Sequence, residues 1–193
     1  MTGIVGIVGR GSVWLAGDRA GVEDGHYFTT VTQPKVFRNG DLVIGYTSSF
    51  RMGQLLQHRF TPPALPNDPA QLDRYMATEF ADAVRATLRD GGWLKRECER
   101  EAGGTYLVGT MGRLFTADGD FNFHEREDGF DACGSGVSVA LGALYATRDA
   151  EADPAERAVL ALSAASRFTA TVRGPFDVIC LPANADECGR RAA

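Results

Sequence analysis

The sequence has 193 residues, of which 20 are Lys or Arg and 25 are Asp or Glu, so the formal net charge is −5. Hydrophobic residues make up 44% and charged residues 23%, which is the balance of a soluble globular protein and excludes general disorder. A net negative charge argues against nucleic acid as the main partner, because phosphate binding needs clustered Lys and Arg. The apolar runs fall short of the ~20 residues that cross a bilayer, so we expect no membrane partner. We expect one folded domain over residues 1–182 and a polar tail over residues 183–193.

Cysteine and histidine residues are too scattered to predict a metal or redox site. No CxxC pair and no Cys/His ligand spacing occurs, so we expect no metal and no cofactor. The segment after Met1 lacks the basic region and the cleavage site of a secretory signal. We therefore expect a cytoplasmic protein with reduced thiols at its four cysteines, Cys98, Cys133, Cys180 and Cys188, which are separated from His26, His58 and His124.

Two β-hairpins are predicted near the start of the chain. Residues 4–8 form an apolar run typical of a strand covered on both faces, and residues 13–16 form the returning strand after a turn around Arg10. Asn39-Gly40 lies between two apolar runs and is a strong hairpin signal, which we interpret as a two-residue turn. A sheet is therefore expected as the first element of the fold.

Helices and further strands follow in groups. Apolar residues recur at helical spacing over residues 49–60, and again between Asp68-Pro69 and Gly91-Gly92. Residues 136–147 are apolar on nearly all sides, which predicts a helix buried between layers. The grouping of strands apart from helices predicts an α+β fold of stacked layers rather than a βαβ sheet. The remaining predicted elements are strands at 105–111, 113–117 and up to Cys133, a helix from Asp153-Pro154 to Phe168, and a strand at 176–181.

Two glycine patterns invite a binding interpretation. The glycines at positions 3, 6, 9 and 11 do not form a dinucleotide fingerprint, because they lie within and between two predicted strands rather than before a helix. Gly134-Ser135-Gly136 lies at a predicted strand-to-helix junction, where free backbone N–H groups and a hydroxyl bind an anion or cap the helix. Helix capping alone is the simpler explanation of this second pattern.

Thr2 is the first candidate for chemistry. If the first hairpin turns around Arg10, strand pairing places Thr2 within one residue of Asp18. Removal of Met1 would expose the α-amine of Thr2, whose unperturbed pKa is about 7.7–8.0. An N-terminal threonine then holds both a nucleophilic hydroxyl and the base that accepts its proton.

The second hairpin adds a cation and a turn. With Asn39-Gly40 as the turn, Lys35 pairs near Ile44, beside the segment 45–49. A Lys in this position either extends to water or, if it points inward beside an Asp, lowers the pKa of a nearby proton donor. The turn at residues 47–49 leads into a helix and can offer backbone N–H groups as an oxyanion hole.

These residues resemble those of proteasome β subunits, most closely the bacterial proteasome-like peptidases in which only Met precedes the threonine. The resemblance covers residues 2–181, with Lys35 displaced by about one residue. Its order and spacing are specific, although each matching segment is weak alone. The matching segments are Thr2-Gly3-Ile4-Val5, Ala16-Gly17-Asp18, Lys35-Val36, Gly45-Tyr46 and Cys133-Gly134-Ser135-Gly136.

The resemblance implies an N-terminal-nucleophile (Ntn) hydrolase with a four-layer αββα sandwich, two antiparallel sheets between helix layers. It implies Thr2 as nucleophile and base, Asp18 and Lys35 as a buried charge pair, and Ser135 as a helper in proton transfer. The same resemblance places oxyanion and substrate-binding groups at Ser48 or Ser49 and at Gly136. It further implies peptide or unfolded-protein substrates, a homo-oligomeric ring of six or seven subunits, possible stacking of rings, and an ATPase partner.

The chain departs from that family at three places. Ser48-Ser49 stands where relatives have glycine. Residues 166–172 lack the Asp that the family has after its last helix, so Ser166 or Thr169 is expected to supply only a hydroxyl. Arg19 follows Asp18 directly and is a competitor of Lys35 for that carboxylate.

Three functions remain open from the sequence. The leading hypothesis is a threonine peptidase that acts by acyl transfer to Thr2. The others are a small-molecule amidase on the same fold and a ring-forming scaffold with a degraded site. A purely structural interpretation also exists, with Thr2 at a strand start, Asp18 in a turn and Lys35 in solvent.

Overall fold

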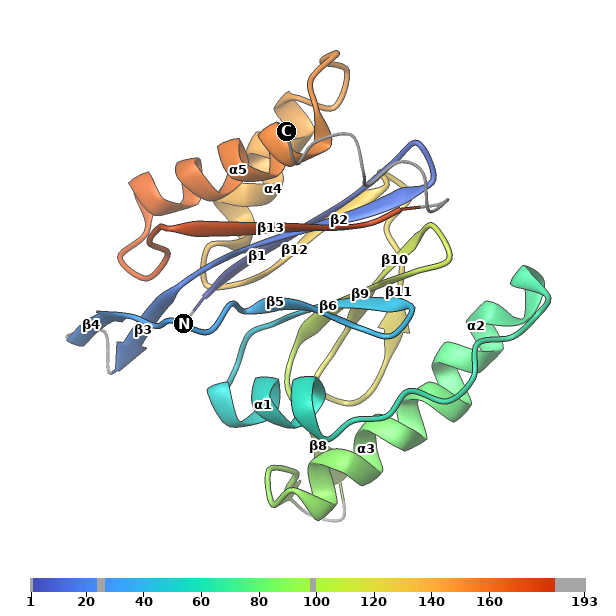
Figure 1. Ribbon diagram of the computed structural model, residues 1–193. Helices are drawn as coiled ribbons and strands as arrows, with labels where there is room; N and C mark the ends of the chain where they lie inside the picture. The colour runs from blue at the N-terminus through green and yellow to red at the C-terminus, as the bar shows by residue number, and fades with distance from the viewer. Residues whose placement is uncertain (1, 24–26, 98–99, 183–193) are drawn as a thin grey trace.

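The computed structural model describes residues 2–23, 27–97 and 100–182, and it is a four-layer αββα sandwich. Figure 1 shows two sheets lying face to face, with α4 and α5 over one outer face and α1 to α3 over the other. Every strand pair in the described residues is antiparallel. The predicted fold class is therefore confirmed. The predicted tail at 183–193 lies outside the described residues.

The first sheet has the order β12-β1-β2-β13. Its strands are β1 (Gly3–Gly9), β2 (Ser12–Asp18), β12 (Phe130–Gly134) and β13 (Phe176–Leu181). Arg10 and Gly11 connect β1 to β2 with φ values of 53° and 77°, so both turn residues are left-handed, as a type I′ hairpin turn requires. The predicted first hairpin is confirmed, and β1 is a central strand.

The second sheet has the order β11-β10-β9-β6-β5. In it, β5 (Val36–Asn39) pairs with β6 (Leu42–Tyr46) so that Asn39 faces Leu42. The two turn residues are therefore Gly40 and Asp41, and the predicted Asn39-Gly40 turn is wrong by one position. Gly40 has a φ of 60°, and Asn39 instead turns its side-chain amide to α1, donating to the carbonyls of Leu56 and Phe60 at 3.1 and 2.9 Å. The remaining strands are β9 (Tyr106–Thr110), β10 (Arg113–Ala117) and β11 (Phe123–His124).

Helices α1 to α3 cover the outer face of this second sheet (Figure 1). Ser49 caps α1 (Phe50–His58) by accepting a hydrogen bond from the N–H of Arg51 at 3.0 Å. The second predicted helix runs from Asp68 to Gly91 in four pieces, with a π-helical segment in the middle. These pieces are η1 (Pro69–Gln71), α2 (Leu72–Tyr75), η2 (Met76–Phe80) and α3 (Ala81–Asp90). Its predicted apolar face is the core-facing one, because Leu72, Tyr75, Met76, Phe80, Val84 and Leu88 are buried.

Helices α4 (Val137–Ala146) and α5 (Pro154–Phe168) pack on the outer face of the first sheet. The prediction that 136–147 is buried between layers is wrong, because only Ala140 and Leu144 of α4 are buried. Val137, Val139, Leu141 and Ala143 are partly buried against the core that α4 shares with α5, whereas Gly142, Tyr145 and Ala146 are exposed, so α4 belongs to an outer layer. None of the described helices combines the length and apolar character needed to span a membrane.

Two short ribbons complete the described structure. The ribbon of β3 (Ala20–Glu23) and β4 (Tyr27–Thr30) continues directly from β2 and projects beyond the two main sheets (Figure 1). The other ribbon, β7 (Lys95–Glu97) and β8 (Arg100–Ala102), follows α3. Apolar side chains from both main sheets fill the space between them, among them Ile4, Leu15, Val36 and Leu107.

Gly53 in α1 is a test of this packing. A Cβ atom there would lie 2.1 Å from the ring of Tyr46. We expect Gly53→Ala to lower the free energy of unfolding by about 1–3 kcal/mol or more, because the ring has to move within a packed core. Gly142→Ala is the matched control, since Gly142 lies in α4 with no neighbouring atom within 4 Å, and there alanine should stabilise the helix by up to ~1 kcal/mol. Chemical denaturation of both variants measures the difference, and equal stabilities would contradict the packing.

Candidate active site

Three strand ends meet at Thr2. Thr2 immediately precedes β1, and Ile4 pairs with Gly17 of β2 on one side and with Cys133 of β12 on the other. This register brings Asp18, at the end of β2, beside the start of β1, and the N–H of Gly3 donates to Asp18 Oδ1 at 3.0 Å. Thr2 is only 6% exposed. The candidate nucleophile therefore lies in a buried, polar end of the first sheet.

Lys35 reaches Thr2 from the second sheet. Its Nζ lies 2.9 Å from Thr2 Oγ1, 3.0 Å from Asp18 Oδ1 and 2.5 Å from the carbonyl oxygen of Ala20. The side chain is 1% exposed. Three acceptors satisfy the three donors of the ammonium group, so no N–H of this buried cation lacks a partner. The backbone of Lys35 lies opposite Tyr46, whose N–H donates to the Lys35 carbonyl at 3.0 Å, and not opposite Ile44 as predicted.

Asp18 is held by backbone donors as well as by Lys35. Its Oδ2 accepts from the N–H of Ala20 at 3.1 Å and from that of Arg173 at 3.3 Å. Arg19 does not compete for this carboxylate, because its guanidinium forms two hydrogen bonds with Asp177, at 2.7 and 2.5 Å. The predicted competition is therefore wrong, since alternation along the chain turns the Arg19 side chain away from Asp18 and toward the neighbouring strand β13.

Burial lowers the pKa of Lys35 below its ordinary value, and the nearby charge of Asp18 offsets part of this effect. A buried ammonium that lies 2.9 Å from a hydroxyl oxygen favours the deprotonated form of that hydroxyl. The arrangement is therefore suited to activating Thr2 Oγ1 as a nucleophile.

Ser135 contacts Thr2 through the backbone and through its hydroxyl. The N–H of Ser135 donates to the Thr2 carbonyl at 2.9 Å, and its Oγ lies 3.4 Å from the same oxygen. The Ser135 hydroxyl also lies 2.5 Å from Thr171 Oγ1. No side chain caps α4, so Ser135 does not serve the capping role that the sequence alone favoured.

Thr171 is a site residue that the sequence did not reveal. Of the two residues expected to supply a hydroxyl, Ser166 lies within α5, and Thr169 Oγ1 donates to the Ala165 carbonyl of α5 at 2.8 Å. Arg173 holds the loop by donating from Nη1 to the carbonyls of Ser166, Thr169 and Val172 at 2.8, 2.6 and 2.7 Å. The loop conformation decides which hydroxyl meets Ser135, and no spacing in the sequence distinguishes Thr171 from the others.

The turn before α1 offers one free backbone donor. Ser48 has a φ of 64°, and the N–H of Ser49 donates to the Thr47 carbonyl at 2.6 Å across it, a tight γ-turn. The N–H of Ser49 is thus occupied, whereas that of Ser48 has no acceptor in the described part of the chain. Ser48 Oγ is used locally, because it accepts from the N–H of Thr105 at 3.0 Å. Of the two predicted oxyanion donors, Ser48 is the available one.

The glycines of the Gly134-Ser135-Gly136 motif are required by close contacts. Gly134 has a φ of 99°, and a Cβ there would lie 2.0 Å from the Thr2 carbonyl oxygen. Gly136 is buried, and a Cβ there would lie 2.8 Å from Val172. Its carbonyl accepts from Ala140 within α4, and in the described residues it makes no hydrogen bond with Thr2. Gly136 therefore lets α4 begin close to the Thr171 loop.

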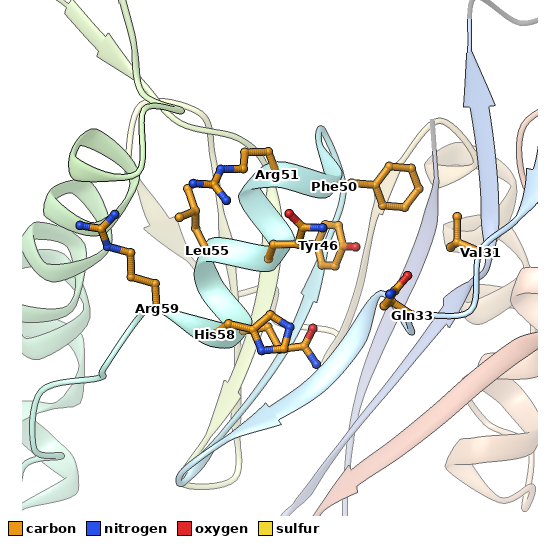
Figure 2. A pocket seen from close by; sticks show the side chains of 10 residues that line it. Val31, Gln33, Tyr46, Phe50, Arg51, Leu55, His58 and Arg59 are labelled. Carbon is orange, nitrogen blue, oxygen red and sulfur yellow. The ribbon is translucent and has the colours of Figure 1, made fainter.

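A pocket of about 400 Å³ opens beside this cluster (Figure 2). Phe50 connects the pocket to the cluster, since its ring centroid lies 5.8 Å from Lys35 Nζ, and Val31 and Tyr46 also line the pocket. Polar and basic residues of α1 form most of the remaining lining, together with Gln33, Leu55 and Arg59. Within the described ranges, no group of three or more His, Cys, Asp and Glu side chains is arranged to hold a metal.

Two antiparallel sheets between helix layers are the fold of proteasome-like proteins. Solved structures share this fold. The BPH protein of Thiobacillus denitrificans, solved in complex with epoxomicin, superposes with a TM-score of 0.77 at 22% identity, over 95% of this chain and 100% of its own. HslV from Trypanosoma brucei matches with a TM-score of 0.66 at 22% identity over 93% of this chain and 98% of its own.

Anbu (ancestral beta-subunit) from Yersinia bercovieri matches with a TM-score of 0.61 at 19% identity, over 93% of this chain and 81% of its own. No protein-family model matches the chain, and no curated protein matches it in sequence. The predicted resemblance to proteasome β subunits is thus confirmed at the level of the fold.

Proposed function

We propose that this protein is a threonine peptidase that cleaves peptide bonds by acyl transfer to Thr2 after removal of Met1. One observation carries the proposal: Lys35 Nζ bonds both Thr2 Oγ1 and Asp18 Oδ1 inside a buried site. A solvated Lys and a turn Asp would not be 1% and 0% exposed and in contact with each other. The purely structural interpretation of these three residues is therefore much weaker than the catalytic one.

In the proposed mechanism, Thr2 Oγ attacks the scissile carbonyl carbon while its proton passes to the α-amine of Thr2. Lys35 stabilises the developing alkoxide. The tetrahedral oxyanion accepts a hydrogen bond from the N–H of Ser48. When the tetrahedral intermediate collapses, the C–N bond breaks and the proton moves from the α-ammonium group of Thr2 to the departing amine. An ester on Thr2 remains. Water, deprotonated by the same α-amine, then hydrolyses the ester and restores Thr2.

Ser135 and Thr171 are proposed to hold the amine end of Thr2. We expect Thr171→Val to lower kcat about tenfold, with KM unchanged, because Ser135 loses a hydroxyl partner worth roughly 1–2 kcal/mol. Thr171→Ser should keep nearly full activity. Thr169→Val is the control, since the Thr169 hydroxyl bonds only α5. Steady-state kinetics over a range of pH test this role. An unchanged kcat in Thr171→Val would exclude Thr171 from the mechanism.

We further propose that residues 1–182 act as one domain of a cytoplasmic homo-oligomeric ring that takes unfolded protein from an ATPase. The fold shared with HslV and BPH supports this assembly without setting the ring size. Size-exclusion chromatography with light scattering tests it, and a monomer at all concentrations would contradict it.

The experiment that tests the activity is intact mass spectrometry with and without a peptide epoxyketone. The similarity to BPH, solved with epoxomicin, motivates this reagent. We expect loss of Met1 and one stoichiometric adduct on Thr2, together with cleavage of fluorogenic peptides. Turnover of small amides without peptide cleavage would favour an amidase instead. A ring that retains Met1, forms no adduct and cleaves neither substrate would be a scaffold.

A further inference from the structure

The pocket beside Thr2 continues across the exposed face of α1 as a groove with a basic lining. Arg51, His58 and Arg59 line it, together with the amides of Gln33, Gln54 and Gln57. Among the residues that the structure describes, no Asp or Glu lines it, and α1 itself contains no acidic residue. The basic lining contrasts with the net charge of the chain, which is −5.

Both arginines keep their charge available to a ligand. Arg51 Nη2 donates to the carbonyl of Gly91 at 3.2 Å, and Arg59 Nη1 donates to that of Asp90 at 3.0 Å, so each guanidinium is anchored at the end of α3. Neither forms a salt bridge in the described part of the chain. The nearby carboxylate of Asp90 lies against Arg89. A guanidinium has five N–H donors, so each arginine retains several for an anion.

The groove is connected to the catalytic cluster at one end. In Figure 2, Phe50 leaves α1 toward Val31, on the side of the strands, while Arg51 and Arg59 leave it toward α3. The Phe50 ring lies 5.8 Å from the ammonium of Lys35, and the N–H of Val31 donates to the carbonyl of Arg19, next to Asp18. A peptide whose scissile bond lies at Thr2 therefore has an apolar contact first and basic groups farther along.

We propose that this groove binds an acidic side chain of the peptide substrate, with Arg51 and Arg59 as the residues that determine the preference. The inference rests on the proposed peptidase function for its substrate, but it concerns a separate set of residues. The guanidinium groups hold a carboxylate by charge-assisted hydrogen bonds, and the glutamine amides add uncharged donors. A basic side chain is disfavoured there by like-charge repulsion.

The direct test is binding to the Thr2→Ala variant, which is not expected to cleave its ligand. Fluorescence anisotropy is measured with three series of labelled peptides, a Glu, a Gln and a Lys series. Each series places its residue, in turn, at one of the three positions before the cut, and the peptides are otherwise identical. We expect the Glu peptide to bind more tightly than the Lys peptide at one of these positions, by roughly two- to fivefold for each arginine. The preference should fade at 1 M salt, where the screening length is only about 3 Å.

Substitutions then assign the effect to the two arginines. Arg51→Gln/Arg59→Gln should remove the preference, and Arg51→Glu/Arg59→Glu should reverse it toward Lys. Arg148→Gln is the matched control, since Arg148 is an exposed arginine that stacks on Tyr145 of α4, in the opposite helix layer. Thermal melts check that each variant is folded. Tighter binding of the Lys peptide by Arg51→Glu/Arg59→Glu would be a gain of affinity, which misfolding does not produce.

The outcomes separate this inference from the proposed function. The proposed role of the groove is overturned by equal binding of the three series, by no binding, or by a preference for Glu that survives Arg51→Gln/Arg59→Gln. Wild-type chain that binds the Glu series but cleaves no peptide would leave the groove standing and overturn the peptidase. Where cleavage occurs, kcat/KM should follow the same order, and Arg51→Gln/Arg59→Gln should change it without preventing epoxyketone labelling of Thr2.

Discussion

Replacing Thr2 with Ala should reduce peptide cleavage by at least about 10³-fold, because the proposed reaction has no other nucleophile. Thr2→Ser should retain measurable activity, since it keeps the hydroxyl that Lys35 Nζ contacts at 2.9 Å. Thr2→Ala should also lower stability by about 1–3 kcal/mol, because one N–H of the buried Lys35 ammonium loses its acceptor while the bonds to Asp18 and Ala20 remain. Hydrolysis of a fluorogenic peptide, with thermal melts alongside, provides both measurements.

The matched control is Thr78→Ala, which alters an exposed threonine whose hydroxyl, among the described residues, bonds the Arg74 carbonyl one turn earlier. Full activity of this control with loss in Thr2→Ala would assign the nucleophile. Activity that survives in Thr2→Ala would exclude the mechanism. A chain that retains Met1 should be as inactive as Thr2→Ala, because its Thr2 nitrogen is an amide and cannot accept the proton.

Lys35→Met should abolish activity and destabilise the protein. The substitution leaves the Asp18 carboxylate buried without its cation, and breaking a buried pair in this way costs about 3–5 kcal/mol. Three backbone N–H groups still bond Asp18, so we expect the lower end of that range. Urea denaturation and peptide hydrolysis measure the two losses separately.

The double variant Lys35→Met/Asp18→Asn separates catalysis from folding. It leaves no buried charge at this site, so it should recover part of the lost stability, while the activity should remain absent because no cation faces Thr2. Arg38→Met is the control, since Arg38 lies on β5 near Lys35 but is exposed, and its polar contacts with the described residues are Asp41 and the Gly40 carbonyl in the turn. If the double variant regained activity together with stability, Lys35 would be structural and not catalytic.

Local patterns predicted most of the strands and helices correctly, because each has a strong signal within a few residues. The first hairpin follows from the glycine turn around Arg10, and Asp153-Pro154 begins α5 with Asp153 Oδ1 accepting from Ala155 at 2.8 Å. The errors arise where contacts with other elements determine the conformation or the burial of a segment. Asn39 does not join the turn because its amide bonds the end of α1, and α4 lies on the surface although its sequence is apolar.

The residues of the candidate site also fall into those predictable from local sequence and those that depend on the tertiary structure. The proximity of Thr2 and Asp18 follows from one short hairpin, whose register depends on local turn geometry and is readable from sequence. The roles of Lys35 and Ser135 came instead from resemblance to a family, since they lie on different elements from Thr2. Thr171 had no signal of its own, because its loop is shaped by the bonds of Arg173 to three carbonyls.

Short-range periodicity and turn signals thus determine which segments form strands and helices and in what order, because these properties depend on neighbours along the chain. Packing of the two sheets decides the rest. It turns Lys35 inward onto Thr2 and Asp18. Strand pairing within the first sheet brings Arg19 to Asp177, and the position of α1 beside Val31 and Gln33 forms the basic groove. These contacts join residues that are distant in sequence, so only the folded chain defines them.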